Sequence, residues 1–114
     1  MPIELGYLTL SVNELERAKA FYGKLFGWEF EAGLAGDGYA HVKNTATPLG
    51  FTSEGARSFA NLYFRVPDLG VATARVRELG GEVSNEFTSP SGQGALCRDD
   101  QGTEFSLWQA APGY

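Results

Sequence analysis

An internal duplication is the feature that most restricts how this 114-residue chain can fold. When the sequence is shifted by 54 positions, the segment Tyr7–Gly27 falls on the segment Asn61–Gly81. The aligned positions keep their apolar character: Leu8 falls on Leu62, Val12 on Val66, Leu15 on Leu69, Ala18 on Ala72 and Leu25 on Leu79. This repeat predicts two copies of one supersecondary unit, residues 1–57 and 58–114, within a single domain 1–114.

Each copy opens with a pattern that is typical of a strand followed at once by a helix. In Tyr7–Val12, polar and apolar residues alternate, as they do in a strand that buries one face. Asn13 is the expected helix N-cap, and Glu16 would complete a capping box with it. Gly27 is the expected end of this helix, which should lie on the apolar side of its own strand.

Helices are predicted near 14–26 and 68–79, and further strands follow each of them. In the first copy the expected strands are 28–31, 39–43 and 49–53, with a turn at Gly33–Gly38 and a connector at Glu54–Phe59. In the second copy they are a strand at Val83, then 93–97 and 103–108, followed by a loose tail, 110–114. The order βαβββ occurs twice, so we predict an α+β fold.

Charge and cysteine usage exclude several classes of function. The net charge is −5 without any block of like charges, which argues against nucleic acid or an anionic membrane as a partner. Cys97 is the single cysteine, so no intrachain disulfide is expected. No apolar run approaches the roughly 20 residues that span a bilayer. The first residues lack the pattern of a signal peptide, so the cytoplasm is the expected location.

One face of each predicted sheet combines aromatic rings with hydrogen-bonding groups. Alternation along the strands puts these residues on it: Tyr7, Thr9, Ser11, Tyr39, His41, Lys43, Thr52, Glu54, Asn61, Tyr63, Arg65, Gln93, Ala95, Cys97, Glu104, Ser106 and Trp108. If two such sheets curl towards each other, they enclose a cup of the kind that binds small organic molecules. The alternative is that the rings pack where the half-sheets meet, or in a dimer interface.

Three segments carry a resemblance to a known superfamily: Tyr7–Tyr22, Leu25–Trp28 and Asp99–Trp108. With them, the chain resembles the vicinal oxygen chelate superfamily, which includes glyoxalase I, extradiol dioxygenases, fosfomycin-resistance proteins and bleomycin-resistance proteins. The resemblance covers nearly the whole chain. It implies paired βαβββ modules whose curved sheets form a cup, and it implies a homodimer, because members of this length commonly pair.

Enzymes of this superfamily hold a divalent metal in the cup, and the resemblance allows their ligand positions to be carried over. These positions fall on Tyr7, Thr52, Asn61 and Ser106. Phenol, hydroxyl and carboxamide groups are weak ligands compared with imidazole and carboxylate. The chain therefore resembles the non-metal branch typified by bleomycin resistance, and no cofactor is expected.

The leading hypothesis is a protein that sequesters a small organic molecule in a metal-free cup. The residues expected to bind the ligand are Tyr7, Tyr39, His41, Asn61, Tyr63, Arg65, Ser106 and Trp108. The alternative is a lyase-like, dioxygenase-like or isomerase-like enzyme, with His41 as a base or with His41 and Glu54 or Glu104 as unusual metal ligands. A structural module that binds a partner protein is a third possibility. The charges near the cup cancel, so its net sign stays open.

Overall fold

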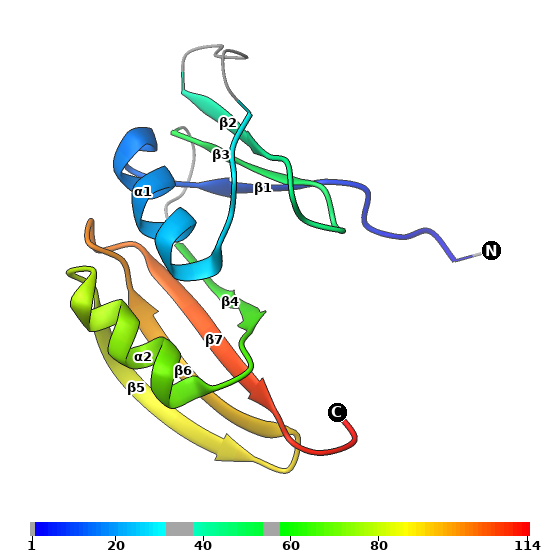
Figure 1. Ribbon diagram of the computed structural model, residues 1–114. Helices are drawn as coiled ribbons and strands as arrows, with labels where there is room; N and C mark the ends of the chain where they lie inside the picture. The colour runs from blue at the N-terminus through cyan, green and yellow to red at the C-terminus, as the bar shows by residue number, and fades with distance from the viewer. Residues whose placement is uncertain (1, 32–37, 54–57) are drawn as a thin grey trace. The chain divides into compact units, whose positions relative to one another are not determined.

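The computed structural model describes residues 2–31, 38–53 and 58–114, which form two compact units, Met1–Arg57 and Ser58–Tyr114. The expected turn at Gly33–Gly38 falls largely outside the described residues, and so does Glu54. Figure 1 shows the elements in order: β1 (Leu8–Ser11), α1 (Leu15–Phe26), β2 (Tyr39–Val42), β3 (Leu49–Thr52), β4 (Ser58–Arg65), α2 (Leu69–Glu78), β5 (Glu82–Ser89), β6 (Gly92–Arg98) and β7 (Glu104–Ala110). The predicted α+β fold is confirmed, and among the described residues each unit contains one helix.

The sheet of the N-terminal unit has the strand order β1–β3–β2, with β1 parallel and β2 antiparallel to β3. Of the predicted strand 28–31, the structure shows an isolated antiparallel bridge between Phe30 and Val42. In it the Glu31 N–H donates to the His41 carbonyl and the Lys43 N–H to the Glu29 carbonyl. The Asn44 side chain explains where the pairing stops. Its Oδ1 accepts from the Glu29 N–H at 2.9 Å, and its Nδ2 donates to the Gly27 carbonyl.

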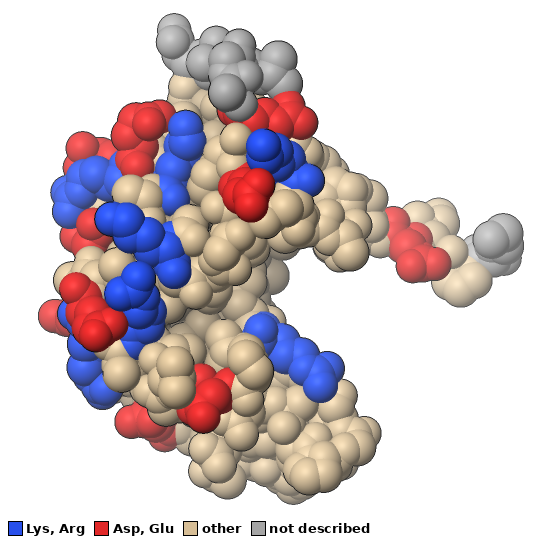
Figure 2. Space-filling model, viewed as in Figure 1, with Lys and Arg blue, Asp and Glu red and all other residues tan. Residues whose placement is uncertain are grey.

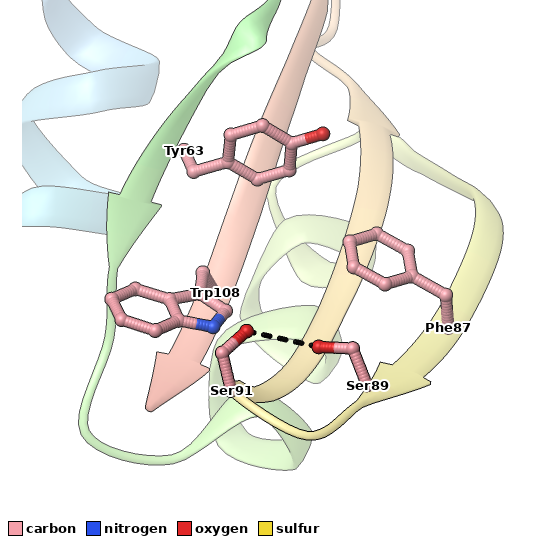
Figure 3. A pocket seen from close by; sticks show the side chains of 5 residues that line it. All are labelled: Tyr63, Phe87, Ser89, Ser91 and Trp108. Atoms are coloured by element: carbon pink, nitrogen blue, oxygen red, sulfur yellow. Dashed lines mark hydrogen bonds between the residues drawn. The ribbon is translucent and has the colours of Figure 1, made fainter. Parts of the chain in front are cut away.

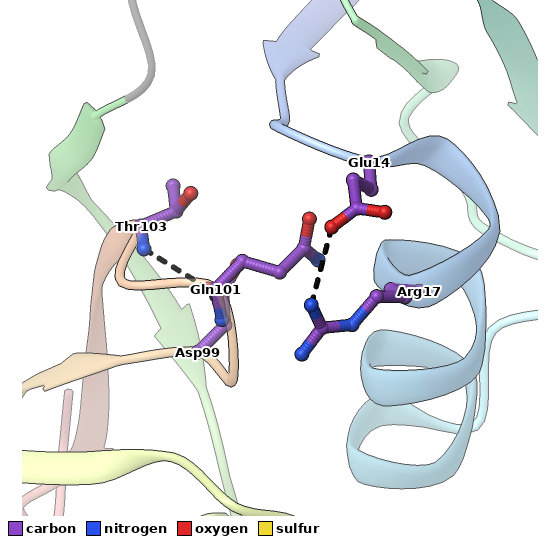
Figure 4. Close-up of polar contacts among 5 residues, drawn as sticks. All are labelled: Glu14, Arg17, Asp99, Gln101 and Thr103. Carbon is purple, nitrogen blue, oxygen red and sulfur yellow. Dashed lines mark hydrogen bonds and ion pairs between the residues drawn. The ribbon is translucent and has the colours of Figure 1, made fainter.

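Helix α1 ends as predicted but begins differently. Its N-cap is Glu14, in extended conformation and without a side-chain capping bond, so the capping box expected from Asn13 and Glu16 is wrong. The Glu14 carboxylate instead pairs with Arg17 at 3.1 Å (Figure 4), and that of Glu16 pairs with Lys19. Gly27 ends the helix in the left-handed conformation, at φ 73°.

The core of the N-terminal unit lies between α1 and the apolar face of its sheet. Leu10, Val12 and Phe51 are buried on the strand side, and Tyr22 is fully buried on the helix. The rings of Tyr22 and Phe51 lie 5.4 Å apart, centroid to centroid. The alternation in Tyr7–Val12 therefore predicts the buried face of β1 correctly.

The C-terminal unit has a four-stranded sheet in the order β4–β7–β6–β5, and α2 covers one of its faces (Figure 1). Asp68 caps α2 by accepting from the Val71 N–H at 3.0 Å. Strand β4 begins earlier than predicted, so Phe59 belongs to it and not to a connector. The register of β4 against β7 shifts between Phe59 and Tyr63, which absorbs this extra length.

The pairing of β6 corrects one prediction about the polar face. Ala95 pairs with Leu107 and Cys97 with Phe105, and all four are buried on the side of α2. Gln93, Ala95 and Cys97 therefore do not share a face with Trp108, which is opposite Gly94. In the part of the chain that the structure describes, no helix is both long and apolar enough to cross a membrane.

Candidate functional site

A groove of about 310 Å³ lies on the face of the C-terminal sheet that points away from α2 (Figure 3). The side chains that line it are those of Tyr63, Phe87, Ser89, Ser91 and Trp108. Tyr63 comes from β4, Phe87 and Ser89 from β5, Trp108 from β7, and Ser91 from the turn between β5 and β6. The lining therefore comes from three strands and one turn, and the groove is formed within one unit.

Two glycines of β6 leave room for the groove between the neighbouring strands. A Cβ on Gly94 would lie 2.1 Å from the Phe87 ring, so only glycine lets that ring lie over β6. Gly92 has φ 148°, and a Cβ there would lie 2.9 Å from the indole nitrogen of Trp108 and 2.1 Å from the Gln109 carbonyl oxygen. The strand thus places its smallest residues between the aromatic rings of its neighbours.

The walls of the groove are aromatic rings that remain accessible to solvent. Tyr63 and Phe87 meet edge to face with centroids 6.3 Å apart, yet Tyr63 is 54% and Phe87 38% exposed. At one end the hydroxyls of Ser89 and Ser91 lie 3.0 Å apart and form a hydrogen bond. Rings of this kind offer stacking surface, and the two hydroxyls offer hydrogen bonds to a polar substituent.

Arg65 lies beside the groove, opposite Trp108 in the β4–β7 ladder. Its guanidinium lies 5.5 Å from the centroid of the Trp108 ring, within cation–π range. Its Nη1 donates to the backbone oxygen of Tyr114, the last residue of the sequence, at 3.5 Å, which is a long hydrogen bond. Most of the five guanidinium N–H donors therefore remain available for a ligand.

A second cluster, formed by Tyr7, Tyr39 and His41, lies on the sheet of the N-terminal unit. The Tyr7 hydroxyl bonds to the Tyr39 hydroxyl and, at 2.8 Å, to His41 Nδ1. The rings of Tyr7 and His41 stack with centroids 5.8 Å apart. Gly50 of β3 makes this possible, because a Cβ there would lie within 2.7 Å of both hydroxyls.

The protonation of this cluster follows from its surroundings. Partial burial and the hydrogen bond with Tyr39 raise the pKa of Tyr7 to about 12. Tyr7 is therefore a neutral phenol at physiological pH, and it can donate to His41 Nδ1 while accepting from Tyr39. The direction of the bond between Tyr7 and His41 depends on the tautomer of the His41 ring.

Known proteins share the sequence pattern and the fold of this chain. The sequence profile of the glyoxalase-like domain family matches residues 7–108. The chain belongs to this family. A glyoxylase-like domain-containing protein from Didymella fabae is 29% identical over 96 residues, covering 75% of each chain.

Two solved structures from Streptomyces sp. CB03234 are similar over most of the chain. One is TnmS3, an antibiotic-binding protein, with a TM-score of 0.74 and 24% identity, covering 96% of this chain and 98% of that one. The other is a glyoxalase/bleomycin resistance protein, with a TM-score of 0.68 and 26% identity, covering 90% and 97%. The resemblance to the vicinal oxygen chelate superfamily is thereby confirmed.

The residues of this glyoxalase-like chain do not fit the metal that its superfamily relatives use. Tyr7, Thr52, Asn61 and Ser106 occupy the positions carried over from the metal-binding members, and none of them offers an imidazole or a carboxylate. The Tyr7 hydroxyl already bonds to Tyr39 and His41. Across residues 2–31, 38–53 and 58–114, no group of three or more His, Cys, Asp or Glu side chains is placed to hold a metal ion.

The structure divides the predicted binding residues into two sets. Tyr7, Tyr39 and His41 form the cluster of the N-terminal unit. Tyr63, Trp108 and Arg65 lie at the groove of the C-terminal unit. Ser106 pairs with Tyr63 but is buried, while Asn61 is exposed in the irregular part of β4, away from the groove lining.

Sequence reasoning missed Phe87, Ser89 and Ser91. The signal was weak, because Phe87 and Thr88 are strand-forming residues directly before the turn at 89–92, but Glu86 and Asn85 before them are not. The shift of register between Val83 and Asn85 obscured it by interrupting the alternation along β5.

Proposed function

We propose that this glyoxalase-like protein binds a small organic molecule with an aromatic ring in the groove of its C-terminal unit, without a metal ion and without changing the molecule chemically. The observation that carries this proposal is the groove itself. The exposed rings of Tyr63 and Phe87 and the half-buried ring of Trp108 surround a volume of about 310 Å³. This volume is at the lower end of the range of about 300–1,000 Å³ that is typical of ligand pockets.

The composition of the groove supports this type of ligand. Its lining contains three aromatic rings and two serine hydroxyls but no carboxylate, imidazole or thiol. Such a surface can stack and orient a ring, but it lacks a nucleophile or base with a suitable pKa. That TnmS3 is an antibiotic-binding protein agrees with a binding role for this fold.

The enzyme alternative receives less support from the geometry. His41 is the one histidine of the chain, and its Nδ1 is bonded to the Tyr7 hydroxyl at 2.8 Å. The Tyr7 hydroxyl thus occupies one of the two ring nitrogens that a general base could use. The groove in which we propose that the ligand binds is lined by residues of the C-terminal unit, and no histidine is among them.

The test uses the two indole N–H groups as reporters. Trp108 lines the groove, whereas Trp28 packs against Tyr22 and Phe51 in the N-terminal unit. The full-length protein is titrated with 2-naphthol in the presence of a metal chelator, and nitrogen–proton correlation spectra are recorded. We expect the Trp108 indole signal to shift and saturate while the Trp28 signal stays in place.

Two variants make this titration specific. Phe87→Ala removes one wall of the groove and should weaken binding by several fold, since an aromatic pair contributes about 0.5–1.5 kcal/mol beyond area burial. Val71→Ala, on the exposed side of α2, is the matched control and should leave the affinity unchanged. Binding that requires an added divalent metal, or that shifts only Trp28, would contradict the proposal.

We also propose that the protein is a homodimer. Ile3 and Leu5 are fully and largely exposed, and β5 is an edge strand of its sheet. Exposed apolar side chains and open strand edges both favour association. Light scattering at high micromolar concentration should give twice the mass of the chain, and a monomer mass would refute the dimer.

A further inference from the structure

We infer that the groove selects an aromatic ring that carries an anionic group, such as a carboxylate or sulfonate, and that Arg65 is the residue that recognises this group. This inference rests on the proposed function. It adds the charge of the ligand, which the sequence left open.

The first step is the position of Arg65 relative to the groove wall. Arg65 and Trp108 are partners in the β4–β7 ladder, so their side chains leave the sheet on the same face. The guanidinium lies 5.5 Å from the Trp108 ring centroid. An aromatic ring that stacks in the groove therefore brings a substituent at its edge close to Arg65.

The second step is the balance of charge on this face. Pairing puts Arg98, Glu104 and Glu82 on the same face as Arg65. Arg98 and Glu104 form an ion pair with an N–O distance of 3.7 Å. Glu104 precedes Trp108 by four residues, which is about 13 Å at the rise of a strand. Glu82 lies at the same end of the sheet as Glu104, because both pair with Arg98.

Screening by salt determines which of these charges acts on a ligand in the groove. The Debye length is about 8 Å at physiological ionic strength, so Glu104 and Glu82 act only weakly at the groove. The groove lining itself contains no acidic side chain. Within the described residues no Asp or Glu side chain pairs with Arg65, and its contact with the backbone oxygen of Tyr114, the last residue of the sequence, is long, at 3.5 Å. A positive charge with free donors therefore borders a groove in a protein whose net charge is −5.

The third step is the chemistry of the cation. A guanidinium has a planar fork of N–H donors that matches the two oxygens of a carboxylate. Contact with the Trp108 ring, 5.5 Å away, restricts the guanidinium before the ligand arrives, which lowers the entropy lost on binding. A carboxylate or sulfonate on the ligand's ring therefore binds the Arg65 guanidinium more strongly than a neutral amide does.

The test compares two probes of the same shape, 2-naphthoate and 2-naphthamide, by titration of the Trp108 indole signal in full-length protein. We expect 2-naphthoate to bind about fivefold more tightly, the equivalent of about 1 kcal/mol for a partly exposed ion pair. Raising the salt concentration should reduce this preference. In Arg65→Gln the two probes should bind equally, and in Arg65→Lys the preference should fall to an intermediate value.

Arg75→Gln is the matched control. It removes one positive charge from α2, on the other side of the sheet, where Arg75 pairs with Glu78 at 3.3 Å. The preference for 2-naphthoate should survive this change. Equal binding of both probes by the wild type, or a preference that persists in Arg65→Gln, would overturn the role of Arg65 while leaving the proposed function intact. If neither probe moves the Trp108 signal, the groove does not bind aromatic molecules and both proposals fail.

Discussion

Replacing Gly94 by alanine should displace the Phe87 ring from the wall of the groove. The new Cβ would lie 2.1 Å from the nearest atom of the Phe87 ring. Carbon atoms in contact are normally about 3.5 Å or more apart, so the ring must move by about 1.4 Å. Phe87 is 38% exposed, so its ring can turn towards solvent instead of compressing the core.

The magnitude follows from the contact that this movement breaks. Phe87 loses its edge-to-face contact with Tyr63, worth about 0.5–1.5 kcal/mol. We expect the free energy of unfolding in urea to fall by about that amount. The affinity for 2-naphthol should fall by roughly two- to tenfold, because the same energy is lost from the groove wall.

Gly6→Ala is the control, since a Cβ at Gly6 has nothing within 4 Å and should alter neither quantity. A Gly94→Ala protein with unchanged 2-naphthol affinity would show that Phe87 does not form a wall of the binding site. A destabilisation above about 3 kcal/mol, at the upper end for overpacked cores, would show that the ring is not free to move.

Three further predictions concern the fold and the N-terminal cluster. Leu107→Ala should lower the free energy of unfolding in urea by about 2–5 kcal/mol, because Leu107 is fully buried against the α2 side; a loss below about 0.5 kcal/mol would contradict the register of β7. Asp68→Ala should cost about 0.5–2 kcal/mol in thermal unfolding through loss of the α2 cap, whereas Asn13→Ala should cost less than about 0.5 kcal/mol because Asn13 caps nothing. Tyr7 should titrate near pH 12 by ultraviolet absorbance. Because its pKa in the folded state lies above the unfolded value of 10.0, its contribution to stability is present below pH 10 and is lost between about pH 10 and 12. A Tyr7→Phe protein with the same absorbance titration would refute this assignment.

The repeat of 54 positions predicted the order of elements because each copy must bury the same apolar positions. Leu10, Val12 and Val76 are buried where the alternation and the helix stripe put them. The helix ends at Gly27 for a reason visible in the sequence, since glycine tolerates the left-handed conformation. Local patterns of this kind depend only on residues close together in the chain.

Features that depend on register between strands could not be predicted in the same way. The register shifts at Phe59/Tyr63 and Val83/Asn85 change which side chains share a face, and no single residue in the sequence indicates where these shifts occur. The face of β6 was predicted one residue out of place because its register is set by pairing with β7, which lies later in the chain; this put Cys97 on the wrong side and hid the role of Gly94. Phe87 was missed because the shift at Val83/Asn85 interrupts the alternation along β5. Tyr63 and Trp108 were found because each lies in a strand whose alternation is locally regular.

The binding of an aromatic molecule in the groove can be tested most directly by intermolecular nuclear Overhauser effects between 2-naphthol and the protein. If the groove binds the ring, its protons should give cross-peaks to side chains of Tyr63, Phe87 and Trp108, which come from three different strands. Cross-peaks to Tyr7 and Tyr39 instead, or no cross-peaks at saturating probe, would contradict the groove as the binding site.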